Sequence, residues 1–100
     1  MIIEILEARF PASVDRKQVE DWVNNVSKPA DEKAGYKMIR YAWTHIGGPM
    51  NMGIFIGELD GLADMERVWT VKEIQETTAE FRRRFPNVEG GRSKILEVIE

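Results

Sequence analysis

The feature that most constrains the fold is a pair of apolar segments joined by a glycine- and proline-rich break. Residues 36–46 (YKMIRYAWTHI) and 52–59 (MGIFIGEL) are rich in β-branched and aromatic residues, with Gly47, Gly48 and Pro49 between them. This pattern predicts two strands joined by a turn. Odd- and even-numbered positions are both substantially apolar, so each face of the hairpin needs a covering layer.

A strand and a helix are predicted before this hairpin. Residues 2–10 (IIEILEARF) alternate roughly between apolar and polar positions and end at Pro11, which is typical of a strand. Ser13 or Asp15 can cap the helix that follows. Its apolar residues recur at helical spacing: Val19, Trp22, Val23 and Val26. We expect Pro29 and the polar run over residues 29–35 (PADEKAG) to close this helix as a loop.

A helical region and a last strand are predicted after the hairpin. Two apolar stripes at helical spacing, Leu62, Met65, Trp69 and then Ile74, Thr78, Phe81, Phe85, are out of phase by about one residue. We therefore expect a kink or break at Thr70–Val71. Residues 93–99 (SKILEVI) form the last strand. The order βαββαβ over residues 1–100 predicts one α+β domain of the ferredoxin-like plan: a four-stranded antiparallel sheet with both helices on one face.

The second face of such a sheet also needs a cover. Two helices protect only one face, and the hairpin is apolar on both. Large exposed apolar patches are rare on monomers, and two copies of the chain can bury the patch by pairing their sheets face to face. We therefore expect a homodimeric α+β barrel, in which the partner of each chain is a second copy.

Residues 45–67 (HIGGPMNMGIFIGELDGLADMER) resemble a segment of NIPSNAP family proteins. In that family a Gly-Pro-Leu-Asn turn leads into a strand, and an acidic-Asp-Ser-Leu-Ala sequence starts the next helix. The counterparts here are Gly48, Pro49, Met50 and Asn51, and then Glu58, Leu59, Asp60, Gly61, Leu62, Ala63 and Asp64. The similarity continues more weakly to the C-terminal residues; before residue 36 only the order of elements agrees.

The chain departs from the family pattern at Gly47, an additional glycine, and at His45, where an acidic residue often stands. The resemblance implies a dimeric α+β barrel and no settled set of catalytic residues. Relatives by fold include cofactor-independent monooxygenases of the antibiotic-biosynthesis type, so the resemblance keeps enzymatic use of the barrel open.

Composition removes several classes of function. The chain has no cysteine, which excludes disulfides and thiolate chemistry, and with one histidine we expect no metal site. Its net charge of −3 argues against nucleic-acid binding, and we read the basic run over residues 82–84 as a solvated helix end. It has no apolar run of about 18 residues, and its first residues (MIIEILEARF) carry an acidic residue at position 4 and no basic region, so we expect no membrane partner and a cytoplasmic protein. No nucleotide motif is present, and nothing besides His45 favours haem, so we expect no cofactor.

Four residues near the predicted turn are the candidate site. His45 is the candidate catalytic acid or base, because imidazole titrates near neutral pH. Tyr41 and Trp43 share its strand face and are candidate walls of a pocket for an apolar or aromatic molecule, with Asn51 at the mouth. Alternatively, His45 lies at a strand end bonded to the turn, and Asn51 stabilises the turn through its own side chain. The hypotheses are thus a small-molecule-binding barrel, with or without cofactor-independent monooxygenase-like chemistry, and a non-catalytic module whose sheet face is filled by dimer packing.

Overall fold

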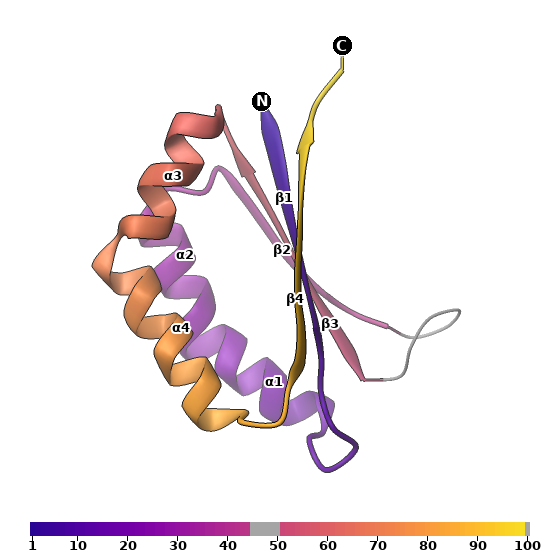
Figure 1. Ribbon diagram of the computed structural model, residues 1–100. Coiled ribbons are helices and arrows are strands. Elements are labelled where there is room, and N and C mark those ends of the chain that lie inside the picture. The colour runs from indigo at the N-terminus through magenta and orange to yellow at the C-terminus, as the bar shows by residue number, and fades with distance from the viewer. Residues whose placement is uncertain (45–50, 100) are drawn as a thin grey trace.

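A computed structural model describes residues 1–44 and 51–99, with the backbone alone for residues 91–93. The described elements follow the order β1 (Ile2–Arg9), α1 (Arg16–Trp22), η1 (Val23–Ser27), α2 (Lys28–Ala34), β2 (Met38–Trp43), β3 (Met52–Leu59), α3 (Leu62–Thr70), α4 (Lys72–Arg84) and β4 (Glu89–Glu97). The strands form an antiparallel sheet in the order β2-β3-β1-β4. All helices lie against one face of it (Figure 1). The predicted α+β, ferredoxin-like fold is confirmed.

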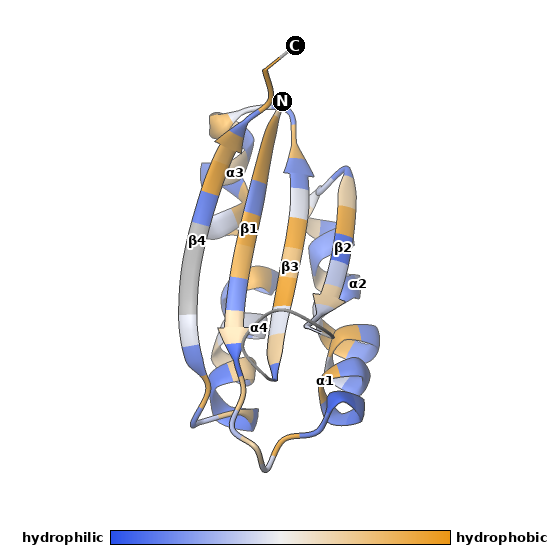
Figure 2. Cartoon of the chain, turned by 90° about the vertical axis from the view of Figure 1, so that its right-hand side faces the viewer, coloured by the Kyte–Doolittle hydropathy of each residue, from blue (hydrophilic) through white to orange (hydrophobic). Residues whose placement is uncertain are grey.

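The strand register assigns every sheet residue to one of two faces. Ile2 and Glu4 of β1 are buried under the helices and pair with Leu59 and Gly57 of β3, so these positions share the helix-covered face. The same alternation places four isoleucines of the central strands on the other side, which we call the open face: Ile3, Ile5, Ile54 and Ile56. Figure 2 looks onto this face, with β1 and β3 at its centre.

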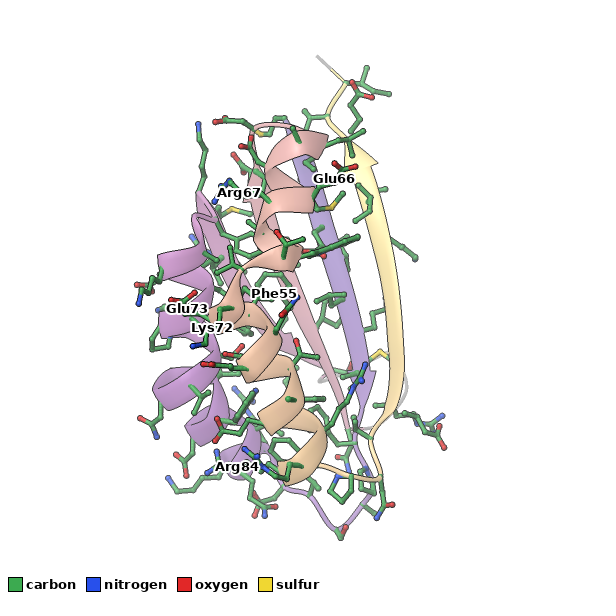
Figure 3. The ribbon with its side chains drawn as sticks, turned by 60° about the vertical axis from the view of Figure 1, so that its left-hand side comes forward. Phe55, Glu66, Arg67, Lys72, Glu73 and Arg84 are labelled. Atoms are coloured by element: carbon green, nitrogen blue, oxygen red, sulfur yellow. The ribbon has the colours of Figure 1, made fainter. Side chains whose placement is uncertain are left out.

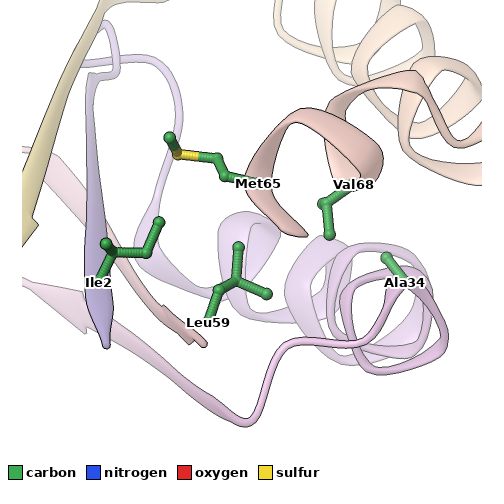
Figure 4. Close-up of a cluster of buried hydrophobic side chains, with 5 residues drawn as sticks. All are labelled: Ile2, Ala34, Leu59, Met65 and Val68. Carbon is green, nitrogen blue, oxygen red and sulfur yellow. The ribbon is translucent and has the colours of Figure 1, made fainter. Parts of the chain in front are cut away.

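Two apolar clusters fill the space between the sheet and the helices. Figure 4 shows the first, which joins the end of the sheet to α2 and α3 and consists of Ile2, Ala34, Leu59, Met65 and Val68. The second is aromatic and is built on Phe10, Trp22 and Phe85, with Phe81 and Trp43 packed against it. Trp22 is therefore a core residue, as its helical stripe predicts. Arg84, at the end of α4 (Figure 3), stacks its guanidinium over the Trp22 ring.

The prediction of a loop over residues 29–35 is wrong, because the helical path continues to Ala34. Asp15 caps α1 through a reciprocal capping box with Gln18. The path then widens into the π-helical turn η1, in which the Lys28 N–H donates to the Val23 carbonyl five residues earlier. Pro29 follows in the first turn of α2, where a missing N–H is tolerated. The helix ends instead at Gly35, in the left-handed region at φ +108°.

The predicted break between α3 and α4 is confirmed. Val71 adopts extended backbone angles (φ −66°, ψ 133°) between the two helices. The last strand begins at Glu89, earlier than predicted, because a register shift opposite Glu7 and Ala8 lets Gly90 join the sheet at φ +129°. No helix in the described residues is long and apolar enough to cross a membrane.

Candidate functional site

A carboxylate lies in the core between the sheet and α3. Glu4 of β1 is 1% exposed, and both of its oxygens accept hydrogen bonds from aromatic side chains. Tyr36 donates its hydroxyl to Oε1 at 2.5 Å, and the Trp69 indole N–H donates to Oε2 at 2.9 Å. Because a buried carboxylate is costly unless its oxygens are satisfied, these two donors explain how β1 accommodates an acid.

A second acid lies close to the first, on α2. Tyr41 donates its hydroxyl to Oδ2 of Asp31, and the Ser27 hydroxyl lies 3.4 Å from the same oxygen and 3.1 Å from the Tyr41 hydroxyl. Burial raises the pKa of Asp31 from 3.8 to about 6, hydrogen bonds from Tyr41 and Ser27 oppose the rise, and the negative charge of Glu4 adds to it. Asp31 therefore exchanges its proton close to neutral pH.

One aromatic ring connects the two acid–tyrosine pairs. Phe55 of β3 packs edge-on against Tyr36 at 5.3 Å between ring centroids, and in a tilted arrangement against Tyr41 at 5.4 Å. Burial is the main reason that the pKa values of both tyrosines rise above their ordinary value, and each neighbouring carboxyl adds to the shift. Both hydroxyls thus remain protonated donors. We call the set Glu4, Ser27, Asp31, Tyr36, Tyr41, Phe55 and Trp69 the interior polar cluster.

Two open grooves reach the ends of this cluster, each of about 330 Å³. The β2 groove runs between strand β2 and the α1–η1–α2 path and is lined by Arg16, Val19, Glu20, Val23, Asn24, Lys28, Ile39, Arg40, Tyr41, Ala42 and Trp43. The α4 groove is lined by Trp69, Ile74, Gln75, Thr78, Ala79 and Arg82. Tyr41 connects the first groove to Asp31, and Trp69 connects the second to Glu4.

The structure brings together two of the four residues that the sequence nominates. Tyr41 and Trp43 both line the β2 groove from the helix-covered side of the sheet. Asn51 has positive φ (56°), and its amide donates to the Pro11 carbonyl at 3.3 Å, at the end of β1. Its backbone carbonyl also accepts from Phe10 at 2.8 Å, so Asn51 holds two loops together. His45 lies outside the described residues.

The sequence reasoning missed Glu4, Asp31, Tyr36 and Trp69. Trp69 is 46% exposed, rather than a core residue as its helical stripe suggests, and its indole N–H turns inward to Glu4. A signal for Glu4 was available, because strand alternation places it on the face of Leu6, Ala8 and Phe10. An acidic residue at a core position of a strand calls for a buried partner. Asp31 carried no such signal, because its segment was assigned to a loop.

No group of three or more His, Cys, Asp or Glu side chains within the described ranges is arranged to hold a metal ion. The interior polar cluster offers instead two carboxyls, two phenolic hydroxyls, one serine hydroxyl and one indole N–H. Such groups accept and donate protons and orient a polar ligand atom, and they lie against aromatic rings that favour a planar molecule.

The fold and the buried acids define a ferredoxin-like α+β protein with a polar cluster between its sheet and its helices. Neither a family model nor a curated protein matched the sequence. Solved structures do match over nearly the whole chain. A NIPSNAP family protein of unknown function from Agrobacterium tumefaciens has 19% identity and a TM-score of 0.70, covering 96% of this chain and 86% of its own.

Two further structures extend the likeness. A candidate antibiotic biosynthesis monooxygenase from Deinococcus radiodurans has 12% identity and a TM-score of 0.77, and covers 100% of this chain and 94% of its own. A dimeric ferredoxin-like protein of unknown function from Thermobifida fusca has 14% identity and a TM-score of 0.73, and covers 97% and 90%. The resemblance to NIPSNAP family proteins is thus confirmed at the level of the fold.

Proposed function

We propose that the protein binds a small apolar or aromatic molecule in the β2 groove. The observation that carries this proposal is that Tyr41 makes two contacts at once: it lines the groove, and its hydroxyl donates a hydrogen bond to the half-buried Asp31. A ligand seated in the groove would contact an aromatic wall that is held in place from the core side. Preorganised walls of this kind reduce the entropic cost of binding.

The lining of the groove supports an apolar or aromatic ligand. Val19 and Val23 face it from the helical side, and Ile39, Tyr41 and Trp43 from the strand. Trp43 is held by a stacked contact with Phe10, at 5.8 Å between ring centroids. A volume of about 330 Å³ lies at the lower end of the range for small-molecule sites.

Heteronuclear NMR tests the proposal directly. A panel of bicyclic aromatic compounds, each added to millimolar concentration, should shift the backbone signals of Val19, Val23, Tyr41 and Trp43 in a saturable way. Signals on the opposite side of the sheet, such as those of Ile3 and Ile54, serve as the internal control. Absence of saturable shifts in the groove for every compound would refute the proposal and favour a non-catalytic packing module.

A second candidate function is proton transfer to a bound ligand, as in a cofactor-independent oxidation by dioxygen. It is favoured by the pKa of Asp31, about 6, because a carboxyl that titrates near neutral pH can accept a proton from an acidic hydroxyl. The description of the Deinococcus radiodurans relative supports it as well. His45 remains a second candidate acid or base.

Oxygen uptake tests this candidate function. A dihydroxynaphthalene and dioxygen give a naphthoquinone and hydrogen peroxide, and the protein should accelerate this reaction with a pH dependence that follows Asp31. Asp31→Asn should abolish the acceleration while the groove still binds the compound. Equal rates with and without the wild-type protein would rule out this chemistry.

We further propose that the chain forms a homodimer through its open face. Ile3, Ile5, Ile54 and Ile56 lie at the centre of this face on β1 and β3, and charged residues such as Arg40 and Lys94 lie around them. An apolar centre with a polar rim is typical of subunit interfaces. The dimeric description of the Thermobifida fusca relative supports a second copy as the occupant.

Light scattering at micromolar concentration tests the dimer. Wild-type protein should have twice the chain mass of 11.5 kDa, and Ile54→Lys should give monomers because it places a charge at the centre of the interface. Ala63→Lys, on the exposed surface of α3, adds the same charge and should leave the dimer intact. A monomeric wild type would overturn the proposal.

A further inference from the structure

The rim of the β2 groove carries an excess of positive charge. Arg16 of α1, Lys28 of α2 and Arg40 of β2 all line the groove, and Glu20 is the only acidic residue among its described lining residues. Arg16 binds Glu20, with 2.7 Å between Nε and Oε1, so these two charges cancel each other. Lys28 and Arg40 form no ion pair within the described residues. Two cations, from opposite walls, are thus left to face a ligand.

Arg40 is held beside the groove by the backbone of its own strand. Because β2 is an edge strand, one side of its backbone has no neighbouring strand among the described residues. The Arg40 guanidinium folds back over this edge and donates from Nη1 to the Ile39 carbonyl at 2.9 Å. A guanidinium has five N–H donors, so the others remain available to an anion. Arg40 projects from the open-face side of β2, and this contact holds its guanidinium at the strand edge that borders the groove.

The distribution of charge across the groove sets the orientation of a ligand. The chain as a whole is acidic, with a net charge of −3, so a positive rim is opposite to the overall charge. At the inner side of the groove Tyr41 leads to Asp31, and Glu4 lies further inside. An anionic group would be repelled by these two acids and attracted by the rim. The apolar body of the ligand would then lie against Val19, Val23 and Trp43.

We infer that the ligand of the β2 groove is a small aromatic or apolar carboxylate, whose charge lies between Lys28 and Arg40. This inference rests on the proposed function, since it specifies the class of molecule that the groove selects. The guanidinium is suited to bidentate binding of a carboxylate, and the ammonium of Lys28 adds a mobile positive charge.

Three compounds of the same ring and different charge test the inference by calorimetric titration of the full chain: naphthoate, naphthalenemethanol and naphthylmethylammonium. At low salt we expect naphthoate to bind about five- to tenfold more tightly than the neutral alcohol, and the ammonium compound to bind most weakly. Raising the salt to about 0.5 M should remove most of the difference between naphthoate and the alcohol, because the rim is exposed to solvent.

Matched variants assign the preference to the two cations. Lys28→Gln and Arg40→Gln should each weaken naphthoate binding about two- to fivefold and leave the alcohol unchanged. Lys17→Gln removes the same charge from α1 outside the groove lining and should change neither affinity. Unchanged naphthoate binding in the Lys28→Gln/Arg40→Gln double variant would overturn the inference.

The outcomes separate this inference from the proposed function. Equal binding of the three compounds in the groove would overturn the carboxylate preference and support the aromatic site. Tighter binding of the ammonium compound would also overturn the preference. If none of the compounds binds, the proposed function fails and the inference fails with it.

Discussion

The interior polar cluster depends on the absence of a side chain at Gly57. A Cβ atom at this position would lie 2.6 Å from Cδ1 of Tyr36 and 2.7 Å from Cζ of Phe55. Ordinary contacts of such atoms are 3.4–4 Å, so both rings would have to move by about 1 Å. The Tyr36 hydroxyl would then leave hydrogen-bond distance of Glu4, which it now contacts at 2.5 Å.

Gly57→Ala should therefore destabilise the protein by about 2–4 kcal/mol. Overpacking of a core costs about 1–3 kcal/mol, and a lost hydrogen bond to a charged group costs about 1.5–3 kcal/mol. Lower backbone entropy of the unfolded chain returns about 0.4–1 kcal/mol. Such a loss corresponds to a fall in Tm of about 8–30 °C for a domain of this size.

Urea unfolding followed by circular dichroism, at one protein concentration, measures this effect. Two other glycines provide a graded control. A Cβ at Gly61 meets no atom within 4 Å, so Gly61→Ala should change the free energy of unfolding by at most about 0.5 kcal/mol. A Cβ at Gly53 meets Phe10 at 3.2 Å, and Gly53→Ala should lie between the two. If Gly57→Ala is as stable as Gly61→Ala, the rings are not locked as described and the reasoning is refuted.

Three further variants test the acids. Because the folded-state pKa of Asp31 is raised from 3.8 to about 6, its favourable contribution is full below pH 3.8 and is lost as pH rises through 6. Asp31→Asn should therefore gain about 2 kcal/mol relative to wild type between about pH 4 and about pH 7, and a pH-independent difference in urea unfolding would contradict this. In the wild type, the hydrogen bond from Tyr41 lowers the pKa of Asp31, so Tyr41→Phe, which removes this bond, should raise that pKa further. NMR titration of the Asp31 carboxyl carbon measures the shift, and a lower pKa in the variant would contradict the assignment. Trp69→Phe removes a donor to the buried Glu4 and should cost about 2 kcal/mol in urea unfolding, against a small effect on unfolding for Thr70→Ser on the exposed surface.

The order of elements could be predicted from the sequence, because each carries its own period and its own stop signal. The alternation in β1 and β3 and the phase change at Thr70–Val71 are local properties of the chain. The helix that continues through Pro29 could not be predicted in this way. Proline normally stops a helix, and only the π turn of η1 places it in a tolerated first-turn position. That accommodation depends on three-dimensional packing as much as on residue type.

The candidate site was predictable only in part. Tyr41 and Trp43 could be assigned to one face by alternation, and the register confirms that they share it. The hydrogen bond from Trp69 to Glu4 joins residues 65 positions apart, and no local pattern encodes such a contact. Asp31 meets Tyr41 only because α2 continues to Ala34 and carries the carboxyl over the sheet. Because residues 29–35 were predicted to form a loop, Asp31 was not recognised as the second acid of the site.

The two interior acids, Glu4 and Asp31, are residues that do not favour the stability of the folded state. Glu4 lies at a core position of a central strand, where an apolar residue of similar volume would need no hydrogen-bond donors and would often be as stable or more stable. Asp31 is held where its charged form is disfavoured, so it lowers the stability of the fold at neutral pH. Local rules of folding are broken most often at functional sites, where stability is exchanged for chemistry. The open face breaks a different rule, since its apolar residues have no covering layer among the described residues, and the proposed dimer would supply one. The two departures would have different remedies: the proposed dimer would cover the open face, whereas the proposed ligand would make use of the interior acids and of the proton that Asp31 exchanges.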